Sequence, residues 1–428
     1  MSDWQQISLG VVETPVRGKV AVPPQGSRAS MSEGYPLRPL GDVMRLDIQR
    51  TPMKPATTYR LAGVLNAGKG LISKGELDGG DTEYAAMNVL HVDQVVMRKL
   101  TAWEGPITVV PAEFDGFVVS NEFPTFTLGP ELLPAWMRHV CGSPRLWAEM
   151  KNRVSGTVQR RKRLNPEQLL QIQLPIPPLE VQERIVEMLD AVDEHIAALD
   201  EEAKALDRVS MAIAEEMLAE KPKVALGTML DDIRGGKSPQ ANNRPPTADE
   251  LGVLKVSAVT PFTFLPEESK SLLPGTLMPK SALVQPGDVL ITRANTPLRV
   301  GAVVRVPAEV RDGLYLADKT LRLVPSPELD PDFLVVAMAL KSARTHLTSS
   351  ATGTSASMVN VSQGRIRDTP IPLVDLGRQR EVSSAVLSVR ANTDAVRAEA
   401  ARLRNARSSL LSGLLNRIIE IESAYLGV

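Results

Sequence analysis

The chain has 428 residues, a net charge of −1 and 43% hydrophobic residues. This length exceeds what one hydrophobic core usually serves, so two or three domains are expected. No apolar run approaches the roughly 20 residues of a membrane span, the first residues lack the pattern of a signal peptide, and Cys141 is the only cysteine. These features argue against a membrane protein and a disulfide-bonded secreted protein, and we expect a cytoplasmic protein.

The first part of the chain predicts an arm followed by a mixed domain. Residues 1–34 are rich in Gly, Pro and Ser without periodicity, which is typical of a loosely held arm. Residues 35–173 contain short β-rich runs such as 117–119, separated by Gly and Pro, and a helical stretch near 135–151. They predict a mixed α and β domain of its own.

This first domain also contains the densest basic stretch of the chain. From Arg138 to Arg163 there are eight Lys or Arg against Glu149 alone. A phosphate-binding surface and a solvated charged face explain such a stretch equally well. Both interpretations therefore stay open.

A segment that occurs twice shows that the chain is built from two related halves. The first copy, LPIPPLEVQERIV, begins at Leu174, and the second, TPIPLVDLGRQREV, begins at Thr369. In each copy a Pro run, which fixes φ and disfavours helix at the preceding residue, is followed by a helical pattern. Gln182 of the first copy corresponds to Gln379 of the second across a two-residue insertion. A repeat of about half the chain indicates two homologous units rather than a solenoid.

Each Pro run leads into a long helix, so we interpret residues 174–222 and 369–428 as Pro run plus spacer helix. From Ile185 apolar residues recur at steps of four and three, a heptad seam of more than four heptads that we expect Pro222 to end. At the end of this seam we place Ser210, Ile213 and Met217. The second seam starts at Val382, has three polar interruptions and is expected to reach the C-terminus.

The two predicted helices carry complementary charge. Glu180–Lys221 holds 13 acidic and 4 basic residues, which leaves 45 basic against 37 acidic residues elsewhere in the chain. Gln379–Val428 holds seven Arg and five acidic residues. Opposite charges beside apolar seams favour pairing, so we predict an antiparallel intramolecular pair. The alternative is two independent amphipathic helices, each packed on its own domain.

Residues 223–368 predict a second mixed domain. Strand candidates are 253–256, 287–291 and 301–305, and a helical stretch follows near 332–347. The predicted fold class is therefore α+β, with two mixed α/β domains separated by two long antiparallel coiled-coil-like helices and an internal pseudo-two-fold repeat.

Enzymatic motifs fit the sequence poorly. Asp231–Ser238 ends like a phosphate-binding P-loop, but Asp231 stands where the first glycine is required. The Asn242–Thr247 segment lacks the aromatic residue of an amino-methyltransferase motif. The four histidines and Cys141 show no metal-ligand spacing. We therefore predict no catalytic residue, no metal site and no cofactor in this chain.

The doubled Pro run and heptad helix, recurring after a second variable domain, resemble the specificity subunit of type I restriction-modification enzymes. The resemblance runs from about residue 35 to the end, and 287–291 and 114–123 resemble strand motifs of that family's target recognition domains. Departures are Val181 and Arg378, where the family usually has Glu before the Gln, and Leu373 in the second Pro run.

This resemblance implies a non-catalytic DNA-binding protein. Residues 35–173 and 223–368 would be two target recognition domains, each reading one half of a bipartite, asymmetric double-stranded DNA target. The helices would set the half-site spacing and dock two methyltransferase subunits, and a restriction or translocase subunit in a cleaving complex. The complex would methylate adenine, with S-adenosylmethionine bound by the partner. The alternative function is a non-catalytic coiled-coil scaffold that presents two protein-binding domains.

The predicted helix length suits such a spacer. The 42 residues from Glu180 to Lys221 would form a helix ~63 Å long, which exceeds one turn of DNA at ~34 Å.

Candidate DNA contacts are Arg or Lys for phosphates and guanine edges, and Asn or Gln for adenine, presented from loops or helix starts. The alternative interpretation of each candidate is a solvated surface residue. Residues 155–160 and 352–357, two loops of small residues before the Pro runs, can also be simple hinges between domain and helix. In the first domain we select Lys69, Lys74, Arg98, Lys99, Asn121, Gly156, Thr157, Gln159, Arg160 and Arg161. In the second domain we select Arg234, Lys237, Arg293, Asn295, Arg299, Lys319, Gly353, Thr354 and Ser355.

Overall fold

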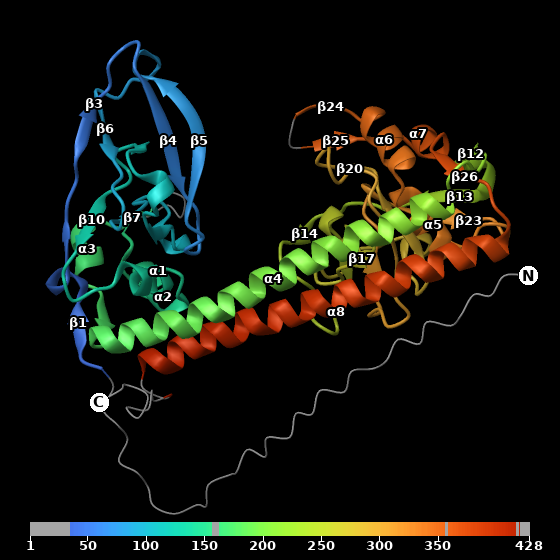
Figure 1. Ribbon diagram of the computed structural model, residues 1–428. Coiled ribbons are helices and arrows are strands. Elements are labelled where there is room, and N and C mark those ends of the chain that lie inside the picture. The colour runs from blue at the N-terminus through green and yellow to red at the C-terminus, as the bar shows by residue number, and fades with distance from the viewer. Residues whose placement is uncertain (1–34, 156–161, 356–357, 417–418, 420–428) are drawn as a thin grey trace, which may run out of the picture. The chain divides into compact units, whose positions relative to one another are not determined.

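Figure 1 shows the computed structural model, which describes residues 35–155, 162–355, 358–416 and 419. The chain divides into two compact units. The first unit comprises residues up to Glu187 together with those from Ser408 onward, and the second comprises Met188–Arg407. Both units contain helices and strands, which confirms the predicted α+β class. No helix in the described part of the chain is both long and apolar enough to cross a membrane.

The first unit is built on an antiparallel sheet with the strand order β2-β10-β7-β8, which we call the first scaffold sheet. Phe126 on β10 is fully buried and lies opposite Val95 on β7. A separate two-stranded pair, β1 with β11, joins the start of this unit to its Pro run. The bounds are β1(Leu37–Pro39), β2(Met44–Leu46), β7(Val95–Met97), β8(Ile107–Val109), β10(Thr125–Leu128), β11(Gln173–Pro175), α1(Pro134–Cys141), α2(Pro144–Arg153) and α3(Pro166–Leu170).

A five-stranded sheet is inserted into this scaffold, with the strand order β3-β6-β9-β4-β5. We call it the first inserted sheet. Its longest ladder joins β4 to β5, from Thr58 opposite Asp78 to Val64 opposite Leu71. The bounds are β3(Arg50–Pro52), β4(Thr58–Val64), β5(Leu71–Asp78), β6(Ala86–Val89) and β9(Val118–Val119).

The second unit repeats the scaffold with the strand order β13-β23-β19-β21, the second scaffold sheet. Leu323 on β23 lies opposite Val289 on β19, and β12 pairs with β26 as β1 pairs with β11. The bounds are β12(Lys223–Ala225), β13(Leu230–Gly235), β19(Val289–Thr292), β21(Val303–Arg305), β23(Thr320–Pro325), β26(Pro370–Pro372), α5(Pro331–Ala339), α6(Lys341–Ser349) and α7(Gln363–Arg367).

The second insertion differs from the first. It forms the four-stranded order β14-β18-β15-β22, the second inserted sheet, with a β16–β17 hairpin between β15 and β18 in sequence. A separate three-stranded sheet, β20-β25-β24, joins β20 to two strands that follow α6. The bounds are β14(Ala241–Asn242), β15(Gly252–Leu254), β16(Val259–Thr260), β17(Thr263–Phe264), β18(Ser269–Leu272), β20(Ala294–Asn295), β22(Leu314–Tyr315), β24(Thr352–Ser355) and β25(Met358–Asn360).

The helical stretch predicted in each domain is a pair of short helices. In the first unit the break follows α1, where the Ser143 hydroxyl accepts a hydrogen bond from the Leu146 N–H and Pro144 occupies the first turn of α2. Ser at the cap and Pro in the first turn are favoured helix starts. In the second unit the break lies at Leu340, between α5 and α6. The helical stretches predicted near 135–151 and 332–347 are therefore confirmed, each as two short helices.

The two long helices are α4(Leu179–Met217) and α8(Leu376–Leu415), and within the second unit they form the predicted antiparallel pair (Figure 1). Asp193 pairs with Arg407, Asp200 with Arg404 and Asp207 with Arg397, so the partner moves backward along α8 as the chain advances along α4. The buried seam positions include Ile196, Leu199, Ala203, Thr393 and Ala400. Both the heptad seam and the charge complementarity are confirmed.

The ends of these helices correct the prediction. α4 ends at Met217, before Pro222, because the Arg378 guanidinium donates to the Met217 carbonyl at 2.8 Å and Glu220 takes a left-handed φ of 58°. The final buried positions are Ala214 on α4 and Leu218 just after it, rather than Ile213 and Met217, since this part of the chain packs into the core of the second unit. α8 ends at Leu415, and residues 417–418 and 420–428 lie outside the described residues.

Candidate nucleic-acid interface

The glutamine of the repeated segment links the helix to its domain in the first unit. Gln182 is fully buried. Its side-chain oxygen accepts from the Leu133 N–H at 2.9 Å, and its amide nitrogen donates to the carbonyls of Glu131 and Pro177, both at 2.8 Å. Three backbone groups are therefore satisfied by one side chain, which we call the first glutamine clamp.

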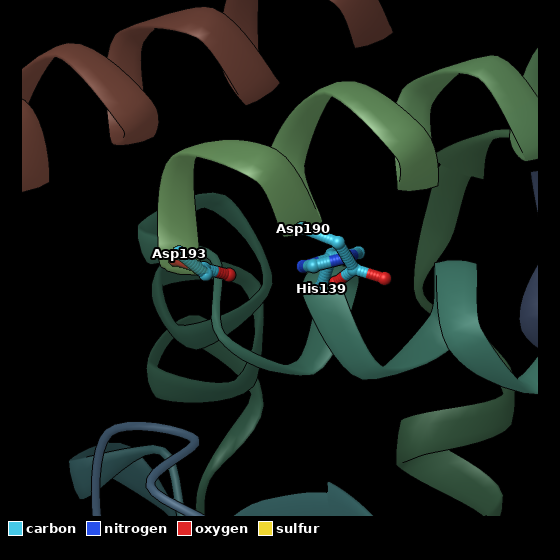
Figure 2. A group of neighbouring side chains, drawn as sticks. All are labelled: His139, Asp190 and Asp193. Atoms are coloured by element: carbon cyan, nitrogen blue, oxygen red, sulfur yellow. The ribbon is translucent and has the colours of Figure 1, made fainter. Parts of the chain in front are cut away.

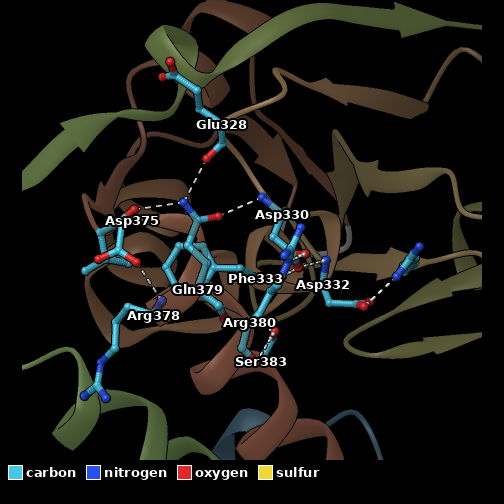
Figure 3. A network of polar contacts seen from close by, with 11 residues as sticks. Glu328, Asp330, Asp332, Phe333, Asp375, Arg378, Gln379, Arg380 and Ser383 are labelled. Carbon is cyan, nitrogen blue, oxygen red and sulfur yellow. Dashed lines mark hydrogen bonds and ion pairs between the residues drawn. The ribbon is translucent and has the colours of Figure 1, made fainter.

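Gln379 makes the same three bonds in the second unit (Figure 3). Its oxygen accepts from the Asp330 N–H at 2.7 Å, and its nitrogen donates to the carbonyls of Glu328 and Val374, both at 2.9 Å. The separation along the chain between each glutamine and its three partners is the same in both clamps. The repeated glutamine is thus a structural residue that anchors the start of each long helix.

Two carboxylates cap the starts of the helices beside the second glutamine clamp (Figure 3). Asp330 accepts from the N–H groups of Asp332 and Phe333, both at 3.0 Å, at the start of α5. Asp375 accepts from the Arg378 N–H at 3.0 Å at the start of α8, and this hydrogen bond lowers the pKa of Asp375. Both carboxylates satisfy free N–H groups of a helix N-terminus.

Three candidate contacts of the first domain are exposed and lie on the first insertion. Lys69 is in the turn between β4 and β5, Lys74 is on β5, and Asn121 follows β9. Long cationic side chains on an exposed hairpin can reach phosphate oxygens without distorting the fold. These three residues remain candidates for DNA contact.

The remaining described candidates of the first domain are less accessible. The Arg98 guanidinium donates to Asn66 at 2.8 Å, Thr101 at 2.7 Å and the Leu100 carbonyl at 3.0 Å, and it pairs with Glu104 at 3.2 Å. These contacts give Arg98 a structural role. Lys99 is half-buried. The other candidates lie outside the described residues, namely Gly156, Thr157, Gln159, Arg160 and Arg161.

The structure brings several candidates of the second domain together at the β20-β25-β24 sheet. The Arg293 N–H donates to the Lys319 carbonyl at 3.0 Å, and Asn295 lies on β20 opposite Val359 of β25. The Lys319 ammonium lies 3.5 Å from the Met358 sulfur. The backbones of Gly353, Thr354 and Ser355 form part of β24.

Three further candidates of the second domain lie apart from that sheet. Arg234 on β13 pairs with Asp232 at 2.8 Å, and this hydrogen bond lowers the pKa of Asp232. Lys237 is exposed just after β13. Arg299 is exposed and lines a cavity together with Arg344, Arg390 and Arg397, which the sequence reasoning did not select. Arg390 and Arg397 are seven residues apart and share one helix face, so the heptad register could have revealed them.

Acidic residues on α4 do not form a free ligand set. Figure 2 shows Asp190 and Asp193 one turn apart on α4, and His139 on α1. The Asp193 carboxylate is paired with Arg407, whose Nη2 donates to it at 2.7 Å. The structure therefore supports a role of Asp193 in helix pairing.

Comparisons with known proteins agree with this architecture. A family model described as type I restriction modification DNA specificity domain matches residues 148–207. The type I restriction enzyme EcoEI specificity subunit of Escherichia coli is 30% identical over 164 residues, which is 38% of this chain and 27% of that relative. The match therefore spans about a quarter of the relative's length.

One solved structure extends the likeness of fold to most of the chain. It is a chain from a structure described as the structural basis underlying complex assembly and conformational transition of the type I R-M system, with a TM-score of 0.52, 19% identity, and coverage of 91% of this chain and 99% of that chain. The HsdS subunit from Thermoanaerobacter tengcongensis gives a TM-score of 0.39 and 19% identity over 91% of this chain and 98% of its own.

The fold and the repeated clamp define a two-domain protein joined by paired helices. Residues 148–207 of this chain resemble the DNA specificity domain of type I restriction-modification systems.

Proposed function

We propose that the chain is the DNA-specificity subunit of a type I restriction-modification complex, in which each variable domain reads one half of an asymmetric, bipartite target. The observation that carries this proposal is the duplication of one scaffold with two unlike insertions. Identical insertions would favour a palindrome, as in a symmetric dimer, whereas unlike insertions favour two unlike half-sites.

The long helices suit the role of spacer. α4 has 39 residues and is about 58 Å long at 1.5 Å per residue, which still exceeds one turn of DNA at ~34 Å. The observed helix is three residues shorter than the predicted one. The shorter helix is therefore still long enough for the proposed spacer role.

The exposed cations supply the charge for backbone contacts. Lys69 and Lys74 lie on the first inserted sheet, and Lys237 and Arg299 lie in the second domain. Phosphate contacts would position each domain, and amide side chains such as Asn121 and Asn295 would read adenine edges.

The chemistry would reside in partner subunits. The helices would dock two methyltransferase subunits that bind S-adenosylmethionine and methylate adenine, and a restriction or translocase subunit would join them in a cleaving complex. The whole complex would act in the cytoplasm of a bacterium or archaeon. None of these steps requires a catalytic group from this chain.

The experiment is co-expression of the chain with the methyltransferase encoded nearest to it, followed by mapping of methylated adenines by single-molecule sequencing. We expect one bipartite, asymmetric motif. The double variant Lys69→Ala/Lys74→Ala should weaken methylation of every site about uniformly, because phosphate contacts carry no base information. Asn121→Ala should instead relax the motif in one half-site only.

Lys223→Ala is the matched control, since Lys223 is exposed on β12, outside both inserted sheets and both long helices. It should leave the methylation pattern unchanged. A purified chain that binds no methyltransferase and shows no salt-dependent affinity for duplex DNA would refute the proposal. That result would favour the coiled-coil scaffold for protein partners.

A further inference from the structure

A cavity of about 550 Å³ lies within the second unit, where α4 and α8 meet the domain that follows α4. Four arginines from three separate parts of the chain line it. Asp207 is the one carboxylate among its described lining residues. The arginines are Arg299 before β21, Arg344 on α6, and Arg390 and Arg397 on α8.

The charge in this cavity is not balanced. Asp207 is shared between Arg397, at 2.5 Å, and Arg390, at 3.2 Å. The Arg344 guanidinium donates only to the backbone carbonyls of Val300 and Leu298 among its described partners, at 2.8 and 3.1 Å, and burial lowers its pKa. Asp394, outside the lining, also pairs with Arg397 at 3.7 Å, so four guanidinium groups against two carboxylates leave an excess of two positive charges around the cavity.

Arg390 is the buried member of the set. It is 8% exposed, and its Nε–H has no hydrogen-bond partner among the described residues. Burial lowers the pKa of Arg390, which means that the surroundings do not fully compensate its charge. A buried donor without a partner is unfavourable, and an acceptor in the cavity would satisfy it.

One wall of the cavity is held in a strained conformation. Phe262 has a φ of 63° in the two-residue turn between Thr260 and Thr263. That position of a turn after Pro261 favours glycine, and a bulky residue there is an outlier. The Arg390 guanidinium stacks on the Phe262 ring at 4.0 Å, and the Phe262 N–H donates to the Val303 carbonyl at 3.2 Å. Strain of this kind is characteristic of ligand-binding walls.

We propose that this cavity binds a phosphoryl group. The planar fork of a guanidinium matches two phosphate oxygens at once. The apolar side chains of Met211, Val335 and Met338 also line the cavity, and they would strengthen the attraction by lowering the local dielectric constant. The group could come from a free phosphorylated small molecule or from a DNA backbone. The site does not depend on the proposed function, because a free phosphate would occupy it equally well.

Isothermal titration calorimetry of the full chain with inorganic phosphate, in a buffer of low ionic strength, tests the proposal. Arg299→Gln removes an exposed guanidinium, and we expect it to weaken phosphate binding about tenfold, the cost of one charge-assisted hydrogen bond. Arg390→Lys keeps the charge but loses the fork and the stacking, so a similar loss is expected. Arg402→Gln is the control, since Arg402 is exposed on α8 and outside the lining.

Binding that is absent from the unchanged chain, or that falls equally in all three variants, would overturn the proposal. If circular dichroism shows that Arg390→Lys is misfolded, Arg299→Gln decides alone. Competition with duplex DNA of random sequence identifies the source of the group. Displacement of bound phosphate assigns the site to a DNA backbone, and retention assigns it to a free phosphorylated molecule. Loss of DNA-directed methylation with intact phosphate binding would reject the proposed function but leave this site standing.

Discussion

The first scaffold sheet pairs Phe126 with Val95, and the second pairs Leu323 with Val289 at the corresponding positions. The glutamine clamps match bond for bond. The inserted sheets, in contrast, have different strand numbers and orders. The shared positions are those that satisfy buried backbone groups or fill the core, where any change leaves a polar group unpaired. The inserted sheets have buried residues of their own, such as Val119 in the first and Leu254 in the second, but their strand orders do not match.

At one corresponding position the two scaffold sheets carry different side chains. Arg322 lies opposite Leu290 in the second scaffold sheet, and Thr125 lies opposite Val96 in the first. Arg322 is 9% exposed, pairs with Asp288 at 2.6 Å and donates to the Ser281 carbonyl at 3.0 Å. Thr125 donates its hydroxyl to the Asp47 carbonyl. The same place in the fold is thus a buried ion pair in one unit and a neutral hydrogen bond in the other.

The largest effect should come from breaking this buried ion pair. Arg322→Met leaves Asp288 without its charged partner, and we expect a loss of about 3–5 kcal/mol in the unfolding free energy of the second unit. Thr125→Val should cost the first unit only about 1 kcal/mol. Hydrogen exchange detected by mass spectrometry resolves β19 and β23 from β7 and β10. Equal losses in the two units would contradict this account of the pair.

The next effect should come from the glutamine clamps. Gln182→Leu and Gln379→Leu each leave three buried backbone groups unpaired, so we expect a loss of about 3 kcal/mol in either unit. The protection of α1 should fall in the first variant and that of α5 in the second, as measured by hydrogen exchange.

Gln171→Leu and Gln363→Leu are the matched controls, because both glutamines are exposed. They should change the unfolding free energy by less than about 0.5 kcal/mol. If only one clamp variant is destabilising, the two scaffolds are not equivalent.

The sequence was most informative where a pattern extends over many residues. The repeat around Gln182 and Gln379, the heptad seam and the opposite charges of the two helices all predict the paired helices correctly, because each rests on periodicity or composition. The end of α4 was misplaced because Arg378, which caps Met217, is 161 residues away from it. A contact of that kind leaves no local signal.

Single site residues were harder to predict for the same reason. Arg98 and Lys74 look alike in sequence, as basic residues of a β-rich domain. Only the fold shows that Arg98 binds Asn66, Thr101 and Glu104 while Lys74 is exposed. Arg344 was not selected because it is held by the backbone carbonyls of Leu298 and Val300. Every residue has such a carbonyl, so the sequence gives no sign of this contact.

A smaller effect is expected from the ion pairs along the helices. Arg404 and Asp200 are both close to half exposed, so Arg404→Gln should cost less than about 1 kcal/mol. The loss should shrink as salt is added, because exposed charges are screened. Urea unfolding at low and high salt measures it. A loss that does not depend on salt would show that Arg404 acts through packing rather than charge.

The smallest effect should come from a pair that belongs to the second insertion alone. The two terminal guanidinium nitrogens of Arg244 donate to the two carboxylate oxygens of Glu250, each at 2.6 Å. The Thr247 N–H donates to the same carboxylate at 2.9 Å. The hydrogen bonds from Arg244 lower the pKa of Glu250 from 4.5 to about 2. Because the folded pKa lies below the unfolded one, the pair stabilises the insertion above about pH 4.5 and its contribution is lost as the pH falls toward 2.

Carboxyl NMR of the full chain should therefore show Glu250 still ionised at pH 3.5, a pH between those two pKa values. Glu250→Gln should abolish that signal. In this variant the unfolding free energy of β14 and β15 should depend less on pH below about 4.5. The first inserted sheet, which lacks this pair, should keep its own pH dependence. A Glu250 carboxyl that titrates near 4.5 would mean that Arg244 does not hold it in solution. The two insertions would then differ in strand order, and the Arg244–Glu250 ion pair would not distinguish them in solution.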